Sequence, residues 1–267
     1  MKNKIGVVST TYPQYSIDEA LDGISKAGFK YVELVTVPGH VEHIVPKPEE
    51  LTEEDADRIL NLCKENSLEI YCIAGHTRLM KEDSIRNLKK VIDAAELFGA
   101  NFVTTDTGEV KTKDDEKKFY SDIKELARYA KLKNLNICLE MHGEWCNNGV
   151  KGAEIIKTIN HPNVKLNYDT ANVMYFGGVK AEDDLEYALP YIAFMHLKDR
   201  GGKLGEWNFP PLGSGNMDFK KIFSLIKNYN GPISVEIEFD GKEHSLREIN
   251  DAVKKSYDFL KSFGYVE

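Results

Sequence analysis

A chain of 267 residues is long enough for one large domain or two small ones. Hydrophobic residues make up 42% of the chain, which provides for a sizeable core and excludes a disordered protein. The net charge of −8 opposes binding to nucleic acid or to an anionic membrane, because both partners need clustered Lys and Arg side chains.

The N-terminal residues are charged and pass directly into a strand-like run, without the apolar stretch of a signal peptide. No apolar run reaches the roughly 18 to 20 residues of a membrane span. The four cysteines form no C-x-x-C pair, which is typical of reduced, buried thiols. These features predict a cytoplasmic protein with neither a membrane nor a nucleic-acid partner.

Strand-like and helical runs alternate through the first half of the chain. Predicted strands cover Ile5–Thr10, Tyr31–Thr36, Glu69–Ala74 and Asn101–Thr105. The first helix begins at Ser16, whose spacing to Glu19 is that of a capping box, and ends near Gly28. Further helices are predicted from about Thr52 to Asn66, up to Phe98, and from Asp114 to Lys133. This alternation indicates βα units.

The alternation continues through the second half. Predicted strands cover Asn136–His142, Val164–Asn172, Ile192–Arg200 and Ile233–Glu238, and predicted helices lie near Ala153–Ile159, Glu182–Leu189, Asp218–Tyr229 and Ser245–Phe263. Eight strands and eight helices, over about the 250 residues typical of such folds, favour a single (β/α)8 TIM barrel domain spanning residues 1–267. An open doubly wound sheet is the alternative, but no Gly-x-Gly-x-x-Gly turn follows the first strand.

Each predicted strand of the second half carries a metal-binding side chain near its C-terminal end: Glu140, Asp169, His196 and Glu236. Parallel strands of a barrel place these ends on one face, so the four side chains are expected to converge. A single carboxylate at a strand end is usually only solvated, but four such ends predict a shared metal site. Three oxygen donors and one nitrogen suit Mn²⁺, Co²⁺ or Mg²⁺ better than thiolate-bound zinc or copper.

Glu140 and Glu236 lie on strands that are not neighbours in the predicted barrel, which places them on opposite sides of its axis. Two such carboxylates beside a metal-bound carbonyl can remove a proton from the adjacent carbon on one face and return one on the other. This chemistry covers epimerisation, aldose–ketose isomerisation and dehydration. The sequence therefore predicts an enzyme with Glu140 and Glu236 as its acid–base pair.

Other polar side chains near these strand ends are candidate substrate contacts. His142 lies on the same side of its strand as Glu140, and either contacts substrate or orients the base. His76 either contacts substrate or packs within its loop. Glu33, if it points inward, hydrogen-bonds a ligand or a neighbouring side chain.

Two long loops follow predicted strands. Val37–Leu51 comes after the second strand, and Lys198–Asp218 comes after the seventh and contains Trp207. Long loops at this face of a barrel are usually lids or substrate walls. Trp207 either stacks on a sugar or packs within its loop.

Five motifs of the chain resemble the xylose-isomerase-like barrel superfamily of sugar isomerases and epimerases. They are Cys-Leu-Glu140-Met-His, Asn-Tyr-Asp169-Thr-Ala-Asn, His196-Leu-Lys-Asp, Pro211–Phe219 and Gly231-Pro-Ile-Ser-Val-Glu236-Ile-Glu. The resemblance covers essentially the whole chain but does not select one activity. In ketose 3-epimerases of this type, residues matching Glu140, Asp169, His196 and Glu236 bind Mn²⁺ or Co²⁺, and those matching Glu140 and Glu236 are the acid–base pair. The resemblance thus implies a carbohydrate substrate, a divalent metal cofactor and a homodimer or homotetramer.

The chain departs from those epimerases at two positions. They carry a histidine three residues after the Asp of the sixth strand, where this chain has Asn172. They place a substrate-binding arginine shortly after the His of the seventh strand, and Arg200 stands at a shorter spacing. The pair Lys198-Asp199 instead resembles a broader group that includes inosose dehydratases and epimerases of oxidised glycosides. Asn172, Lys198 and Arg200 are therefore expected substrate contacts, and dehydration of an inosose or related keto-polyol is the alternative reaction.

The superfamily also contains apurinic-site endonucleases, which have a three-metal phosphodiesterase site. These enzymes need further histidines: here the fourth strand ends in Thr104-Thr105-Asp106, Asn172 replaces one histidine, and no Asp-x-His follows His196. The acidic charge also opposes DNA binding. A non-catalytic sugar-binding barrel is a further alternative, which the retention of all four ligands opposes.

Overall fold

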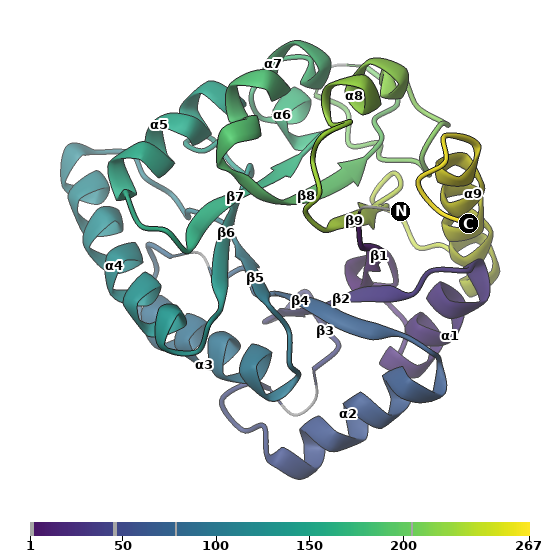
Figure 1. The fold of residues 1–267 in the computed structure, drawn as a ribbon, viewed down its shortest axis with the longest axis horizontal. Coiled ribbons are helices and arrows are strands. Elements are labelled where there is room, and N and C mark those ends of the chain that lie inside the picture. The colour runs from purple at the N-terminus through teal and green to yellow at the C-terminus, as the bar shows by residue number, and fades with distance from the viewer. Residues whose placement is uncertain (1–2, 45–46, 78, 204) are drawn as a thin grey trace.

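The computed structural model describes residues 3–44, 47–77, 79–203 and 205–267. Within these residues, eight parallel strands form a closed ring surrounded by helices, as Figure 1 shows. The ring runs in the order β1-β9-β8-β7-β6-β5-β4-β2 and closes by pairing of β1 with β2. The strands are β1 Ile5–Val8, β2 Tyr31–Val37, β4 Glu69–Ala74, β5 Phe102–Thr105, β6 Asn136–Glu140, β7 Val164–Asp169, β8 Ile192–Lys198 and β9 Ile233–Glu236. The predicted (β/α)8 barrel is confirmed.

A helix follows each strand of the ring and packs on its outside. The helices are α1 Ile17–Ala27, α2 Glu53–Glu65, α3 Ser84–Leu97, α4 Lys113–Leu132, α5 Gly149–Ile159, α7 Ala181–Ala188, α8 Phe219–Leu225 and α9 Leu246–Ser262. Capping boxes begin α1, α2, α4 and α9, where Ser16, Thr52, Thr112 and Ser245 exchange hydrogen bonds with a carboxylate residue three positions on. Helix α9 lies beside α1 and completes the outer ring (Figure 1).

The structure adds short elements to the predicted alternation. In the loop after β2, strand β3 (Val41–Glu42) pairs antiparallel with β2, because Gly39 takes a φ of 73° and turns the chain back. After β7, helix α6 (Asn172–Tyr175) occupies the predicted end of a strand. The predicted count of eight strands and eight helices is therefore wrong in detail: the described residues hold nine strands and nine α-helices, with 3₁₀ helices at Ser9–Thr11 and Leu189–Tyr191.

Several strands end earlier than predicted. Strand β1 stops at Val8 rather than Thr10, because the next residues form a 3₁₀ turn. The predicted strands beginning at Asn136, Val164, Ile192 and Ile233 end at Glu140, Asp169, Lys198 and Glu236. Helix α5 begins before the predicted Ala153, because Asn148 caps it by accepting a hydrogen bond from the Lys151 N–H at 2.9 Å.

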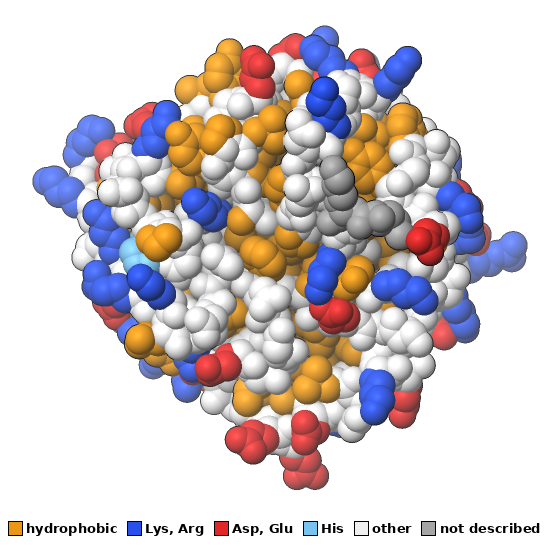
Figure 2. Space-filling view, in the orientation of Figure 1, with side chains coloured by type: hydrophobic (Ala, Val, Ile, Leu, Met, Phe, Trp, Pro, Cys, Tyr) orange, Lys and Arg blue, Asp and Glu red, His pale blue; other side chains and the backbone are white. Residues whose placement is uncertain are grey.

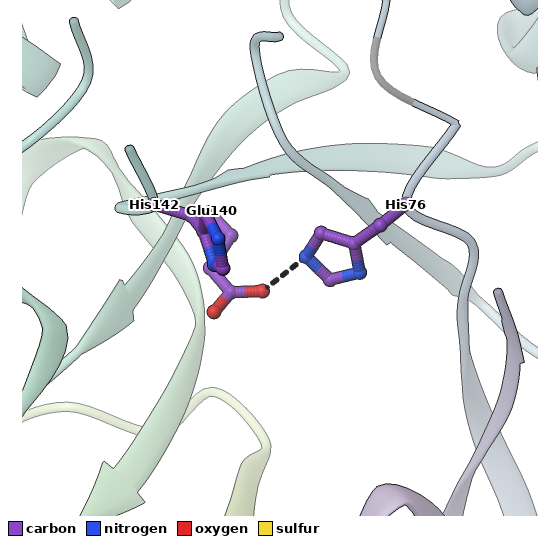
Figure 3. Close-up of side chains that lie close together, drawn as sticks. All are labelled: His76, Glu140 and His142. Carbon is purple, nitrogen blue, oxygen red and sulfur yellow. Dashed lines mark hydrogen bonds and ion pairs between the residues drawn. The ribbon is translucent and has the colours of Figure 1, made fainter. Parts of the chain in front are cut away.

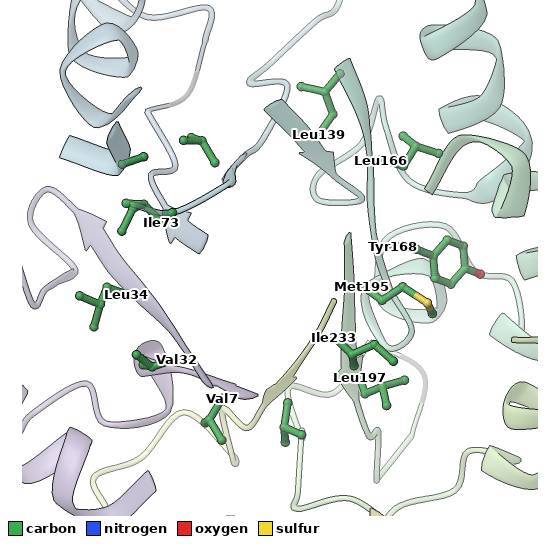
Figure 4. Packing of buried hydrophobic residues seen from close by; sticks show 14 of the residues in the cluster. Val7, Val32, Leu34, Ile73, Leu139, Leu166, Tyr168, Met195, Leu197 and Ile233 are labelled. Carbon is green, nitrogen blue, oxygen red and sulfur yellow. The ribbon is translucent and has the colours of Figure 1, made fainter. Parts of the chain in front are cut away.

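Alternate residues along each strand face the helices or the barrel interior. Figure 4 shows outward-facing side chains packed between the strands and the helices: Val7, Val32, Leu34, Ile73, Leu139, Leu166, Tyr168, Met195, Leu197 and Ile233. Inward-facing polar residues between the middle and the C-terminal ends of the strands are buried: Glu33, Glu140, Asn167, Asp169, His196, Lys198, Ser234 and Glu236. The main hydrophobic core therefore lies outside the ring, and a polar layer lies inside it.

Aromatic side chains fill the barrel interior toward the N-terminal ends of the strands. Tyr71, Phe194, Cys72 and Cys138 form a buried cluster there. The Tyr71 hydroxyl donates to the carbonyl oxygen of Ile233, on the other side of the interior, at 2.8 Å. These buried side chains therefore lie beneath the polar layer.

Charged side chains lie around the outside of the molecule. On the face seen in Figure 2, Lys and Arg alternate with Asp and Glu around the edge, and hydrophobic side chains gather nearer the centre. None of the helices in the described part of the chain is both long and apolar enough to cross a membrane. The four cysteines are buried and free, as predicted.

Candidate metal centre and active site

Four side chains from β6, β7, β8 and β9 meet inside the barrel. Glu140, Asp169 and Glu236 are the last residues of their strands, and His196 pairs with Asp169 in the sheet register. Each side chain offers one ligand atom, and these atoms all lie within 4.8 Å of one another. All four side chains are buried. The structure thus brings together the four residues that the sequence selects as metal ligands, which we call the carboxylate–histidine cluster.

Three atoms of the carboxylate–histidine cluster are buried without a hydrogen bond among the described residues: Asp169 Oδ2, His196 Nδ1 and Glu236 Oε2. Of these, Glu236 Oε2 has an ion pair with Lys198 Nζ at 3.0 Å. His196 Nδ1 lies 3.5 Å from Glu236 Oε2, 3.7 Å from Glu140 Oε1 and 3.9 Å from Asp169 Oδ2. Buried polar atoms normally have partners, and burial of an unpaired charge is strongly unfavourable. Their convergence fits a cation, and three oxygen donors with one nitrogen fit a hard divalent ion.

The electrostatics of the cluster agree with this fit. Burial raises the pKa of Asp169 well above its usual range; Lys198 opposes the rise, and the Glu236 and Glu140 carboxylates add to it. The three carboxylates therefore repel one another when all are ionised. A divalent cation between them would offset this repulsion and allow all three to stay ionised.

Both oxygens of Glu140 have further partners. His76, which follows β4, donates from Nε2 to Glu140 Oε2 at 2.6 Å, the dashed line in Figure 3. Burial lowers the pKa of His76, but the Glu140 carboxylate outweighs burial and raises the pKa to about 9. Asn172, at the start of α6, donates from Nδ2 to Glu140 Oε1 at 3.0 Å. The His142 ring lies 5.8 Å from the His76 ring, so these three predicted substrate contacts surround Glu140.

Glu236 has a cationic neighbour. Lys198 Nζ lies 3.0 Å from Glu236 Oε2 and also contacts the Glu238 carboxylate. Burial lowers the pKa of Lys198, but Glu236 and Glu238 outweigh burial and hold the pKa well above its usual value. The ammonium lies 4.5 Å from the centroid of the Phe209 ring, a cation–π distance. Thr10 donates to Glu236 Oε1 at 3.3 Å. Lys198 is thus charged at neutral pH and lies beside Glu236.

The two remaining predicted contacts lie in the loop after β8. The Trp207 side chain is 36% exposed, and its ring packs against Phe209 at a centroid distance of 4.8 Å. Lys198 Nζ lies 5.9 Å from the Trp207 centroid, so this loop reaches the site. Arg200 donates to the carbonyl oxygen of Lys203 at 2.6 Å, within its own loop. Residue 204 of this loop, and residues 45–46 of the predicted lid after β2, lie outside the described residues.

Several neighbours of the site are absent from the sequence-based prediction, among them Thr10, Phe209 and Glu238. Glu238 lies two residues after Glu236, so the alternation of side chains along a strand is a signal that identifies it. Thr10 and Phe209 reach the site from distant loops, and no local sequence signal marks them. Glu33 does point inward, where its carboxylate contacts His196 Nε2 at 2.9 Å.

A cavity of about 670 Å³ opens beside His142, between the loops that follow β4, β5 and β6. Its apolar lining consists of Met80, Val110 and Trp145. Its charged lining consists of Lys81, Lys111, Asp106, Glu109, Asp115 and Glu144. The volume lies within the range of about 300–1,000 Å³ that is typical of small-molecule sites.

Known proteins share this architecture. Residues 21–263 match the family described as Xylose isomerase-like TIM barrel. The chain belongs to this family. The superfamily predicted from the five sequence motifs is thereby confirmed. No curated protein sequence matches the chain.

Solved structures share the whole fold. A D-psicose 3-epimerase with D-tagatose from Clostridium cellulolyticum H10 has a TM-score of 0.79 at 14% identity, over 99% of this chain and 100% of that one. A probable 3-DHS dehydratase from Bacillus anthracis has a TM-score of 0.74 at 18% identity, over 98% of this chain and 99% of that one. A xylose isomerase-like TIM barrel protein from Mycobacterium smegmatis in complex with magnesium has a TM-score of 0.76 at 16% identity, over 97% of each chain. At these identities the likeness establishes the fold.

Proposed function

We propose that the protein is a divalent-metal-dependent sugar isomerase or epimerase that transfers a proton next to a carbonyl group. The carboxylate–histidine cluster carries this proposal, because four buried ligand atoms from four strands lie within 4.8 Å of one another. Two similar solved structures are named as a D-psicose 3-epimerase and a probable 3-DHS dehydratase, which supports chemistry of this kind.

Glu140, Asp169, His196 and Glu236 would hold the cation. Mn²⁺ suits three carboxylates and one imidazole best, with Co²⁺ and Mg²⁺ as alternatives. When bound, such an ion polarises a carbonyl oxygen and makes the neighbouring C–H more acidic. The magnesium complex among the similar structures supports a divalent ion in this architecture.

The chain itself would supply the proton transfer. Glu140 and Glu236 end β6 and β9, which are separated in the ring by β7 and β8. One carboxylate removes a proton from the carbon beside the carbonyl, and the other returns a proton from the opposite face. His76 and Asn172 hold Glu140 in place by hydrogen bonds of 2.6 and 3.0 Å.

On the Glu236 side, Lys198 would donate to the substrate oxygen on which negative charge develops. Its ammonium lies 3.0 Å from Glu236 Oε2, so it would stand beside the base and close to the carbon from which Glu236 takes a proton. Such a fixed donor in a buried site lowers the energy of the charged transition state. Because Glu236 and Glu238 hold the pKa of Lys198 above its usual value, this donor is charged before proton transfer begins.

The substrate that fits best is an uncharged sugar. Carboxylates outnumber amines in the lining of the cavity beside His142, which opposes a phosphorylated substrate. Trp145 offers an apolar surface for the C–H face of a sugar ring, and Asp106 and Glu144 offer acceptors for its hydroxyls.

Solvent isotope incorporation tests the proposal. Turnover of ketoses, inososes and 3-keto-glycosides with Mn²⁺ in deuterium oxide is expected to place deuterium on the epimerised or isomerised carbon. Glu140→Gln and Glu236→Gln are each expected to lower turnover by about 10²–10⁴-fold. Metal content measured in both variants separates lost proton transfer from lost metal. A product without solvent deuterium, formed by fully loaded enzyme, would indicate hydride shift and overturn the two-carboxylate mechanism.

Dehydration of a keto-polyol is the second candidate, favoured by the position of Lys198. A buried ammonium beside Glu236 can hydrogen-bond a hydroxyl as it departs, while Glu236 removes the proton on the adjacent carbon and passes it to the departing hydroxide, which leaves as water. Mass spectrometry of the product decides between the two reactions, since an epimer keeps the mass of its substrate and a dehydrated product loses water.

A further inference from the structure

Glu33 lies in the barrel interior, directly below the carboxylate–histidine cluster. It belongs to the middle of β2, and its side chain is fully buried. Ser234, which it contacts at 2.6 Å, is one inward position below Glu236 on β9. Glu33 is therefore one layer deeper than the cluster and is not a member of it.

Four donors from four other strands meet the Glu33 carboxylate. Oε1 accepts from Thr104 Oγ1 at 2.7 Å and Cys72 Sγ at 3.4 Å. Oε2 accepts from Ser234 Oγ at 2.6 Å and His196 Nε2 at 2.9 Å. A buried carboxylate is unfavourable unless its oxygens are paired, and here every donor also restrains its position. The carboxylate is thus a fixed point against which the His196 ring is oriented.

The two nitrogens of His196 face different surroundings. Nε2 meets the Glu33 carboxylate, so it carries a proton and donates it in a hydrogen bond. Nδ1 faces the Glu140, Asp169 and Glu236 carboxylates at 3.5 to 3.9 Å and has no hydrogen bond among the residues that the structure describes. With the proton on Nε2, the lone pair of Nδ1 points into the cluster.

We infer that Glu33 is the positioning residue that makes His196 a metal ligand. It holds the proton on Nε2, fixes the orientation of the ring and makes Nδ1 more basic, so that it sets the affinity of the cluster for its cation. Metal-binding histidines generally donate their second N–H to such a partner, whose removal lowers metal affinity about 10–100-fold. The inference rests on the metal centre of the proposed function.

Asn167 is the other polar neighbour of this nitrogen, with Nδ2 at 3.2 Å from His196 Nε2. The assignment of N and O in an amide follows from its partners, and Asn167 Oδ1 accepts the same N–H when the amide is turned over. A neutral amide can orient the ring but supplies no negative charge. The increase in basicity therefore comes from Glu33.

Calorimetric titration of the metal-free protein with Mn²⁺ tests this role. Glu33→Gln keeps the shape of the side chain and removes its charge, and is expected to weaken Mn²⁺ binding about 10–100-fold. Asp184→Asn is the matched control: Asp184 is a buried carboxylate on α7, outside the ring, that accepts from Tyr168 Oη at 2.9 Å. This control is expected to bind Mn²⁺ as the wild type does.

A double-mutant cycle separates positioning of His196 from a general loss of negative charge. If Glu33 acts through His196, Glu33→Gln changes Mn²⁺ affinity much less in a His196→Gln background than in the wild type. Equal effects in both backgrounds would overturn the inference and leave Glu33 as a distant charge.

Two further variants cover the case in which Glu33→Gln does not fold. Ser234→Ala and Thr104→Val each remove one hydroxyl that holds the Glu33 carboxylate, and each is expected to weaken Mn²⁺ binding severalfold. Wild-type Mn²⁺ affinity in every folded variant would overturn the role of Glu33 but leave the proposed metal centre intact. Absence of Mn²⁺ binding to the wild type would overturn the metal centre, and this inference with it.

Discussion

His76 and Glu140 are joined through Nε2 and Oε2 at 2.6 Å, although β5 lies between the strands that carry them. Asn172 holds the other Glu140 oxygen at 3.0 Å, so the carboxylate is fixed at both oxygens. In the proposed function Glu140 would bind a cation and also move a proton, and such a group has to be held in one orientation, since small displacements of a reacting group are costly for catalysis. The His76–Glu140 contact supplies much of that restraint.

Replacing His76 by leucine removes this donor. We expect kcat to fall about 10–100-fold, in keeping with the roughly 1.5–3 kcal/mol of a hydrogen bond to a charged group. His76→Gln keeps an N–H donor and is expected to recover most of the loss. Steady-state kinetics at saturating Mn²⁺ check both variants. Equal losses in the two would contradict a role for the hydrogen bond itself.

Removal of the metal is expected to destabilise the fold, because Glu140, Asp169 and Glu236 then repel one another in a buried site. Free Mn²⁺ at one hundred times its Kd is expected to increase the free energy of unfolding by about 2.7 kcal/mol. Such an increase raises Tm by roughly 5–10 °C. Differential scanning calorimetry with chelator and with Mn²⁺ measures the difference.

Asp169→Asn is the control for that measurement. Asp169 Oδ1 accepts from the Ala171 and Asn172 N–H groups at 2.8 Å each, and asparagine retains this acceptor while it removes the charge. Without metal, the variant is expected to melt at or above the Tm of the metal-free wild type, and Mn²⁺ should raise its Tm little. A full Mn²⁺ shift in this variant would exclude Asp169 as a ligand.

A buried hydrogen bond between Tyr168 and Asp184 joins strand β7 to the helices outside the ring. Tyr168, outward-facing on β7, donates to Asp184 Oδ2 at 2.9 Å, and the same oxygen accepts from the Gly149 N–H of α5 at 2.6 Å. Tyr168→Phe is expected to lower the free energy of unfolding by about 1.5–3 kcal/mol and to leave Mn²⁺ affinity unchanged. Urea denaturation and metal titration measure the two effects. A change in Mn²⁺ affinity would show that packing outside the ring controls the site.

His43 is expected to make stability depend on pH. Its Nε2 donates to the Tyr15 carbonyl oxygen at 3.0 Å, and its buried Nδ1 has no partner in the described ranges. Burial lowers the pKa of His43, and the nearby backbone of Tyr15 and Tyr12 only partly opposes this. The unfolded chain, with a histidine pKa near 6.5, therefore takes up the proton first, and stability is lost as pH falls below about 6.5.

Urea denaturation of the wild type and His43→Gln between pH 8 and pH 5 measures this effect. Other titrating groups are shared by the two proteins, so their difference isolates His43. The stability advantage of the wild type is expected to be constant above pH 7 and to shrink below pH 6.5. A difference that stays the same over the whole range would show that His43 does not titrate on unfolding.

The convergence of the cluster could be predicted because it follows from local pattern. Glu140, Asp169 and Glu236 each end an apolar run, and strands adjacent in sequence are adjacent in the ring over this half of the chain. His196 stands two residues before the end of its strand, which keeps it on the inward face. The alternation of side chains along each strand and the parallel order of the strands were therefore sufficient to predict that the four side chains meet.

The contacts and short elements around the cluster could not be predicted from local pattern. Glu33 contacts Ser234, which is 201 positions away in the chain, and this contact exists only because β1 closes the ring between them. Strand β3 depends on the turn at Gly39, and the short helix α6 has too few residues to show a helical period. These features arise from ring closure and from backbone conformation at single residues.

Tyr71 and Phe194 fill the barrel interior toward the N-terminal ends of the strands, and the carboxylate–histidine cluster lies above them, toward the C-terminal ends. A cation or a sugar bound at the cluster would therefore be expected to exchange through the mouth at the C-terminal ends of the strands. A cation in the carboxylate–histidine cluster would leave freely while the mouth is empty, whereas a bound sugar would stand in its path. A chelator would then remove the metal much faster from substrate-free protein than from protein saturated with its substrate. Bound substrate would therefore slow the loss of metal during turnover.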